Sequence, residues 1–301
     1  MSAAHSRAYS PAHITGFFRI HDHFQDLAKV GSTGAVVTLE QGVITKVSLK
    51  KSLRQRITIR INGKPLKDPN VSALVVREFV KRRGESWNVA VSHLCRLPIG
   101  SGYGTSGAGA LGLSMALNEA MGDPVSKLEA ARIAHEAEVS SRTGLGTVMA
   151  VFHGGFVVRL KPGAPGKGKI RKLAFSRFER IVSGSFGPMY TPTILSRPHL
   201  RSRVNFCGKG LAGRLLNRPR VDTFLFLSRH FSECLNLMTP RLRRLVKLMD
   251  NEGFSSSMMM IGEAVFCIVH EDLAEAVARL MRRTGVAPVI SGISSRGARL
   301  L

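Results

Sequence analysis

Long apolar runs are missing from this chain of 301 residues. No stretch approaches the roughly 20 uncharged apolar residues that a membrane-spanning helix needs, and the longest candidate, residues 258–270, carries Glu263. The first thirteen residues contain no apolar segment of the kind found in secretory signals, so we expect a cytoplasmic protein. Hydrophobic residues still make up 44% of the chain, which excludes a disordered or fibrous protein.

Cysteines are few and widely separated. The chain has four of them, and no two form a Cys-x-x-Cys pair. A zinc site needs clustered ligands, and a disulfide scaffold is typical of small secreted chains, so we expect neither. The sequence instead predicts four buried thiols in a reducing compartment: Cys95, Cys207, Cys234 and Cys267.

Acidic residues are scarce relative to basic ones. The 20 Asp and Glu against 44 Lys and Arg leave a net charge of +24. Such a balance is typical of proteins that bind nucleic acid, although an anionic substrate is an alternative explanation. The basic residues gather in three tracts without acidic residues, at 46–67, 197–220 and 241–247.

The first half of the chain alternates strand and helix patterns. Two strands, 35–39 and 43–47, flank Gln41-Gly42, and a third, 57–61, precedes an Asn62-Gly63 turn. The other expected elements are a helix at 72–83 ending at Gly84, a strand at 88–97, a helix at 110–121, a helix opened by a capping box of Ser126 and Glu129, and a strand at 156–160.

The second half also mixes both patterns, which makes the protein α+β. We expect a strand at 223–227, and a helix with Thr239 as N-cap, Pro240 in its first turn and Gly253 at its end. Strand material follows at 258–270 around a turn at Gly262, then a helix ending at Gly285 and a last strand at 286–290. A loop at 184–192 suggests two domains, 1–183 and 184–301.

The glycine-rich segment 98–109 carries the strongest functional signal. Glycines let a backbone approach a ligand closely, and a helix follows at once, so backbone N–H groups and the helix dipole together favour phosphate binding. The hydroxyls of Thr105 and Ser106 could bind phosphate oxygens or Mg²⁺. No Gly-Lys-Ser/Thr follows, which excludes a Walker A loop, and the acidic residue of a Rossmann fingerprint is missing.

This loop resembles the second motif of the GHMP kinases, and within them that of the archaeal pantoate kinases. Three further segments agree in order and spacing. They are Pro11-Ala12-His13-Ile14-Thr15-Gly16-Phe17-Phe18, the pair Ala137-Glu138 with Thr143-Gly144-Leu145-Gly146, and Met260-Ile261-Gly262 with Ala264-Val265-Phe266. The resemblance covers about residues 9 to 270.

The resemblance implies an N-terminal ATP-loop domain, a C-terminal ferredoxin-like domain and an active site between them. It also implies phosphorylation of the 4-hydroxyl of pantoate by ATP with Mg²⁺, in archaeal coenzyme A biosynthesis, and it is compatible with a homodimer. The implied ATP-binding residues are Pro98, Gly100, Gly102, Gly104, Thr105, Ser106, Gly107, Ala108 and Gly262.

The resemblance also assigns the metal and the substrate. Ser106 and Glu138 would hold Mg²⁺, with Glu136 as an alternative ligand that a helix turns about 200° away from Glu138. His13 and Thr15 would lie near pantoate, and Arg142 would bind its carboxylate.

Two positions depart from the family pattern. Thr147 occupies the catalytic position at which pantoate kinases commonly carry an Asp base, and Arg19 follows the first motif where an acidic or neutral residue is usual. Threonine cannot accept a proton at neutral pH, although losing a general base typically costs only 10²–10⁴-fold in rate. A second hypothesis therefore stays open: a catalytically impaired relative that binds RNA, on the ribosome for example, through the three basic tracts.

Overall fold

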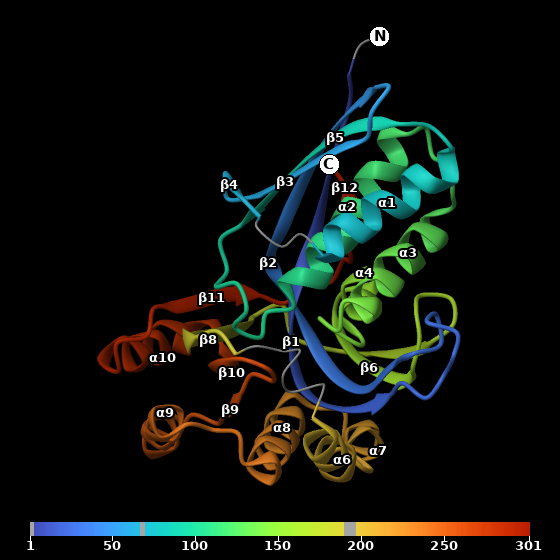
Figure 1. The fold of residues 1–301 in the computed structure, drawn as a ribbon. Coiled ribbons are helices and arrows are strands. Elements are labelled where there is room, and N and C mark those ends of the chain that lie inside the picture. The colour runs from blue at the N-terminus through green and yellow to red at the C-terminus, as the bar shows by residue number, and fades with distance from the viewer. Residues whose placement is uncertain (1–2, 67–69, 190–196) are drawn as a thin grey trace.

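The computed structural model describes residues 3–66, 70–189 and 197–301. Two sheets and their helices form two regions joined along the chain (Figure 1). The larger sheet has eight strands in the order β12-β1-β2-β5-β3-β4, with β6 beside β2 and β7 beside β6. Its strands are β1 (Ala4–His21), β2 (Gly31–Lys51), β3 (Arg56–Ile61), β4 (Lys64–Pro65), β5 (Trp87–Cys95), β6 (Phe156–Lys161), β7 (Lys169–Leu173) and β12 (Arg299–Leu300).

One face of the larger sheet is covered by helices of the first half of the chain (Figure 1). The other face is open over β3, β5 and the adjoining ends of β1 and β2, whereas the helices of the second half of the chain pack on the rest of β1 and on β6. Strand β5 shows the reason, since its residues alternate strictly between buried and exposed positions from Trp87 to Cys95. The apolar side packs on the helices α1 (Asn70–Arg83), α2 (Thr105–Ala120), α3 (Lys127–Ser140) and α4 (Thr147–His153).

The smaller sheet is antiparallel, with the order β11-β8-β10-β9. This architecture confirms the predicted α+β class with two regions. Its strands are β8 (Glu179–Gly187), β9 (Ser256–Met258), β10 (Glu263–His270) and β11 (Pro288–Gly292); the helices of this half are α6 (Pro198–Cys207), α7 (Leu211–Asn217), α8 (Val221–Leu235), α9 (Pro240–Asn251) and α10 (Glu271–Arg283).

The structure confirms the two predicted helix N-caps and the predicted Asn62-Gly63 turn. Ser126 accepts a hydrogen bond from the Glu129 N–H, and Thr239 accepts one from the Leu242 N–H. Asn62 and Gly63 both have positive φ, as the hairpin turn between β3 and β4 requires. Local signals of this kind locate element ends because the hydrogen bonds they make lie within a few residues.

Two predicted elements are wrong. Residues 223–227 lie inside α8 rather than in a strand, because the buried positions Phe224, Leu227, Phe231 and Leu235 follow helical spacing. Strands 35–39 and 43–47 form one strand, β2, without a turn at Gln41-Gly42. The chain stays extended there because Gly42 lies against the Ser10 carbonyl of β1, where a Cβ would overlap it.

The expected state of the cysteines is half wrong. Cys95 and Cys267 are buried thiols, but Cys207 and Cys234 form a disulfide with Cα atoms 5.8 Å apart. It joins the ends of α6 and α8, two helices that pack under β1. These two positions are 27 residues apart in sequence, so spacing alone does not indicate the pair.

The sheets divide the chain earlier than the predicted boundary at 183/184. Strand β8 spans this boundary and belongs wholly to the smaller sheet, so the chain leaves the larger sheet after β7 and returns to it at β12. Residues 190–192 of the expected loop, and Lys67 of the first basic tract, lie outside the described residues. In the described part of the chain, no helix combines the length and apolarity that crossing a bilayer requires.

Candidate functional site

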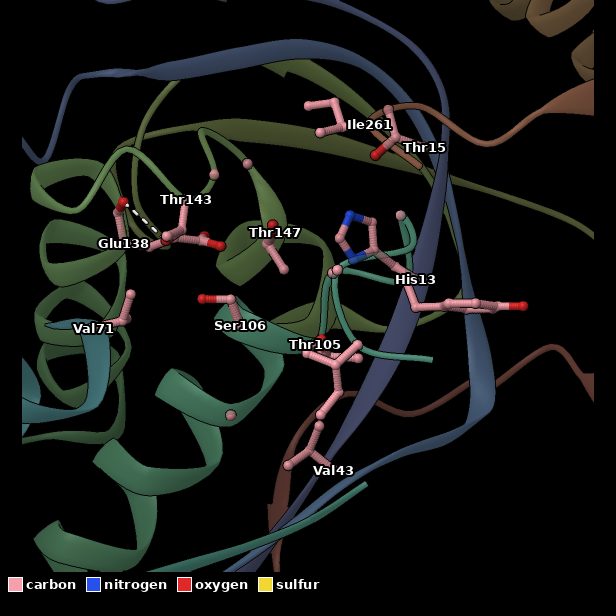
Figure 2. A pocket seen from close by; sticks show the side chains of 18 of the residues that line it. His13, Thr15, Val43, Val71, Thr105, Ser106, Glu138, Thr143, Thr147 and Ile261 are labelled. Atoms are coloured by element: carbon pink, nitrogen blue, oxygen red, sulfur yellow. Dashed lines mark hydrogen bonds between the residues drawn. The ribbon is translucent and has the colours of Figure 1, made fainter. Parts of the chain in front are cut away.

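A cavity of about 500 Å³ lies where the larger sheet meets the smaller one. Its walls come from distant parts of the sequence: His13 and Thr15 on β1, the glycine-rich loop, the end of α3, the loop before α4, and the turn at Met260-Ile261 between β9 and β10 (Figure 2). The Met260 N–H donates to the Thr15 carbonyl at 3.3 Å, which ties this turn to β1.

The glycine-rich loop forms one end of the cavity. Gly100, Gly102 and Gly104 have φ values of +76°, +91° and +62°, a region that side chains other than glycine rarely adopt. Helix α2 begins at Thr105, five residues earlier than predicted, so the second half of the loop is the first helical turn. No side chain caps this helix, and its free N–H groups at the cavity are suited to an anion.

Close packing also constrains Gly104 and accounts for a further glycine, Gly262. A Cβ at Gly104 would overlap the His13 ring, and a Cβ at Gly262 would overlap the Ser101 carbonyl. Gly262 therefore lets the β9–β10 turn pack directly on the loop, although Gly262 itself does not line the cavity. The loop is held between β1 and this turn.

Glu138 presents a buried carboxylate to the cavity. It is 1% exposed, and neither carboxylate oxygen has a hydrogen-bond partner among the described residues. Burial raises the pKa of its carboxyl to about 7, although Thr147, the Val148 N–H and the Arg159 charge oppose the rise. Glycines make room for it, since a Cβ at Gly107 would lie 2.5 Å from Oε1 and one at Gly144 would overlap it.

Ser106 and Thr147 lie beside this carboxylate. Figure 2 shows the Ser106 side chain at the start of α2 and Thr147 at the start of α4, both directed to the space that Glu138 faces. A buried carboxylate without a partner, opposite a hydroxyl, fits the oxygen ligands that Mg²⁺ prefers. Glu136, the alternative ligand, points elsewhere and pairs with Arg132 at 3.7 Å.

Arg159 is a cavity residue that the sequence analysis missed. It lies on β6 and is 2% exposed; its Nε donates to the Ser32 carbonyl at 3.3 Å, and its Nη1 has no partner among the described residues. Burial lowers its pKa to about 10, so it stays charged at neutral pH. The signal was a lone arginine within the apolar run Phe156–Leu160.

His13 lies between the loop and Arg159. Its backbone N–H donates to the Tyr103 carbonyl at 3.1 Å, and its Nδ1 has no partner among the described residues. Burial, and to a smaller extent the Arg159 charge, lowers the pKa of His13 to about 3. The imidazole is therefore neutral at physiological pH and can donate or accept a hydrogen bond.

A second, apolar compartment extends the cavity toward β5. Here His93 is fixed by hydrogen bonds to Thr45 at 2.9 Å and Ser72 at 3.1 Å. Burial lowers the pKa of His93 to about 4, which keeps it neutral. The apolar side chains of this compartment are Val43, Ile61, Leu66, Val71 and Cys95.

The structure brings most of the predicted site residues together. Those that line the cavity are His13, Thr15, Gly100, Gly102, Gly104, Thr105, Ser106, Glu138 and Thr147. Those that do not are Pro98, Gly107, Ala108, Arg142 and Gly262. Arg142 is exposed, so the buried basic side chain in the cavity is Arg159 instead.

Comparison with known proteins gives a consistent result. Residues 71–155 match the model of the GHMP kinases N terminal domain, and residues 210–287 match that of the GHMP kinases C terminal domain. The chain is 34% identical to a pantoate kinase of Thermococcus kodakarensis, with 91% of both chains covered. It is 30% identical to a pantoate kinase of Methanocaldococcus jannaschii, with 95% of this chain and 99% of that one covered.

A solved structure agrees over nearly the whole chain. It is described as a phosphotransferase related to the CoA biosynthesis pathway, and it superimposes with a TM-score of 0.86 and 31% identity. The match covers 99% of this chain and 98% of that one. The similarity therefore extends over both sheets.

Proposed function

The chain belongs to the GHMP kinase family, and we propose from this premise that it transfers the γ-phosphoryl group of ATP to the 4-hydroxyl of pantoate in archaeal coenzyme A biosynthesis. One observation carries the proposal. A single cavity combines an uncapped helix N-terminus behind a glycine-rich loop, a buried carboxylate without a partner and a buried arginine with a free Nη1.

The nucleotide would occupy the loop and the apolar compartment. The N–H groups at the start of α2 would bind the phosphates, with help from the Thr105 and Ser106 hydroxyls. The compartment around Val43 and Val71 would take the adenine, which gains from burial among apolar side chains. His93 is held neutral there and offers no charge to a purine ring.

Ser106 and Glu138 would hold Mg²⁺. The ion, when bound, neutralises charge on the transferring phosphoryl group. Glu138 must ionise to bind it, and its pKa of about 7 shows how much burial opposes that charge without a cation. Thr147 would lie beside the carboxylate as a neutral hydroxyl rather than act as a base.

Arg159 would bind the carboxylate of pantoate. Its free Nη1 faces the cavity, and arginine binds carboxylates through paired N–H donors. His13 and Thr15 add uncharged hydrogen-bonding groups beside it. Among the described lining residues Glu138 is the only carboxylate, so transfer would depend on positioning and electrostatics rather than on a dedicated base.

The test is ADP release from ATP and Mg²⁺, with and without pantoate, on protein freed of nucleic acid. We expect turnover that requires pantoate, falls at least about 10²-fold in Ser106→Ala through lost positioning, and shows a raised KM for pantoate in Arg159→Gln. Arg142→Gln is the matched control, since Arg142 is exposed and outside the cavity.

Two results would contradict the proposal. One is the absence of pantoate-dependent turnover in a protein that still binds ATP. The other is an equal effect of Arg142→Gln and Arg159→Gln on the KM for pantoate. The second hypothesis, an impaired relative that has exchanged catalysis for RNA binding, has no support in the comparisons.

A further inference from the structure

The open face of the larger sheet carries an unusual set of side chains. The outward-pointing residues of β1, β2, β5 and β3 form what we define as the outer basic face. They are His5, Arg7, Tyr9, Ile44, Lys46, Ser48, Lys50, Arg56, Thr58, Arg60, Asn88, Ala90, Ser92 and Leu94. This set contains five Lys and Arg residues and no acidic residue.

Strand register brings these cations together from separate parts of the chain. Arg7 lies opposite Lys46, Lys46 opposite Ser92, and Ser92 opposite Arg60, so one row crosses four strands. A second row joins Lys50, Asn88 and Arg56. With strands about 4.8 Å apart, four of them span roughly 14 Å, so the charges lie close together.

These charges are not neutralised within the protein. Among the described residues, none forms a hydrogen bond or ion pair with the side chain of Arg7, Lys46, Lys50, Arg56 or Arg60. Lys51, at the margin, differs because it pairs with Glu85 at 2.7 Å. An array of unpaired cations on one open sheet face favours a partner with closely spaced negative charge.

The residues between the cations narrow the class of partner. Ser48, Thr58, Asn88 and Ser92 supply short hydroxyl and amide groups. Proteins that bind single strands use several aromatic side chains for stacking. The outer basic face has one, Tyr9, and Arg299 lies over its ring at 4.6 Å while its hydroxyl donates to the Glu40 carbonyl at 2.6 Å. Reading B-form DNA requires an element that enters the major groove, which is about 12 Å wide, and a face of four adjacent strands is too broad to enter it. The wide, shallow minor groove of an RNA duplex exposes phosphates and 2′-hydroxyls, which this combination fits.

A second copy of the chain is a poor occupant. A twofold interface would place this same face against itself. The five unpaired cations of each copy would then meet like charges, with no acidic residue on the face to offset them.

We propose that the outer basic face binds double-helical RNA through its phosphates and 2′-hydroxyls. Strand alternation separates this activity from the cavity: Val43, His93 and Cys95 point inward and line it, whereas their neighbours Ile44, Ser92 and Leu94 lie on the other side of the sheet. RNA bound to the outer side leaves the cavity accessible, so the inference is independent of the proposed function.

The test measures binding of an RNA duplex of about 16 base pairs, a length that known double-stranded-RNA-binding domains span. The variant Lys46→Gln/Arg56→Gln/Arg60→Gln removes three charges of the face. The control Arg244→Gln/Lys247→Gln/Arg283→Gln removes three exposed charges from α9 and α10. A DNA duplex of the same sequence and the single RNA strand are the comparison ligands.

We expect the face variant to weaken RNA-duplex binding by about tenfold or more at low salt, and to reduce the slope of log K against log salt by roughly 2 to 3. The control variant should keep the RNA-duplex affinity and the salt slope of the wild-type protein. The DNA duplex and the single RNA strand should bind to the wild-type protein more weakly than the RNA duplex does. Kinase turnover should be unchanged in the face variant. Three results would each overturn the proposal. The first is an equal loss of RNA-duplex affinity in the face variant and the control, and the second is an equal affinity of the wild-type protein for the DNA duplex. The third is a dimer of this chain that only the face variant disrupts.

Discussion

At the scale of single residues, the buried carboxylate of Glu138 dominates the energetics of the site. Its pKa lies near 7 in the folded protein against 4.5 in a solvated glutamate. Because the folded-state pKa is the higher one, the folded state holds its proton more tightly than the unfolded state. Stability is therefore lost as the pH rises from about 4.5 to 7, by roughly 3 kcal/mol when the group is fully buried.

This linkage predicts that Glu138→Gln stabilises the protein at pH 8 without Mg²⁺, by about 2 kcal/mol after the cost of an unpaired amide. At pH 4.5 the same substitution should have little effect, since the wild-type carboxyl is then protonated. Thermal unfolding in EDTA at both pH values checks this. Glu252→Gln is the control, since Glu252 is exposed and its replacement should leave stability unchanged at both pH values. A gain in Glu138→Gln that is equal at pH 4.5 and pH 8 would contradict the linkage.

Thr147 offers a second prediction at this scale. Restoring a carboxylate by Thr147→Asp should raise kcat by roughly tenfold or more at saturating Mg²⁺, because a base becomes available. The new charge would also lie beside Glu138 and raise its pKa further, so more Mg²⁺ should be needed for half-maximal activity. Steady-state kinetics across a magnesium titration measure both effects. Thr147→Val, which adds no base, should not raise kcat.

Residue patterns predicted much of the site but not all of it. His13, Ser106 and Glu138 were identified from motif resemblance, and the structure gathers them around one cavity. Arg159 was missed, and Arg142 was preferred in its place, because sequence proximity to Glu138 says nothing about which side chain faces inward. Burial and strand pairing place Arg159, and both depend on residues far away in the chain.

At the scale of elements, the packing of α8 on β1 depends on Gly16. A Cβ at this position would overlap Ser228 and Phe224, two fully buried residues of α8. Gly16→Ala should therefore push the helix away and destabilise the protein by roughly 2–3 kcal/mol. Chemical denaturation measures the change in unfolding free energy.

Gly213 is the matched control for this prediction. It lies within α7, and no atom is within 4 Å of the Cβ that alanine would add. Gly213→Ala should leave stability unchanged or raise it by up to about 1 kcal/mol, because alanine favours helix. If both variants lost a similar unfolding free energy, the packing of α8 would not depend on the missing side chain at Gly16.

Element prediction succeeded where the determining contacts are local. The caps at Ser126 and Thr239 and the turn at Asn62-Gly63 were predicted, since each is set within four residues. The segment 223–227 was misassigned because a window of five apolar-rich residues is too short to distinguish strand from helix. Only the longer pattern to Leu235 reveals the helical period.

At the scale of the whole molecule, the family motifs predicted the two-region architecture, whereas the distribution of charge could not be predicted. A basic tract in sequence becomes a surface only through strand register. Residues of tract 46–67 join Arg7 of β1 on one face, whereas tract 197–220 lies on α6, α7 and their flanks. Sheet order is a set of long-range pairings, so local composition carries little information about it.

The contact between Gly262 and Ser101 has a consequence for folding during translation. The glycine-rich loop emerges from the ribosome some 160 residues before the turn that packs on it and closes the cavity beside Thr15. A nascent chain can fold its first sheet and still lack a wall of the site. We therefore expect catalytic competence to arise only late in translation, once residue 262 can pack on the loop.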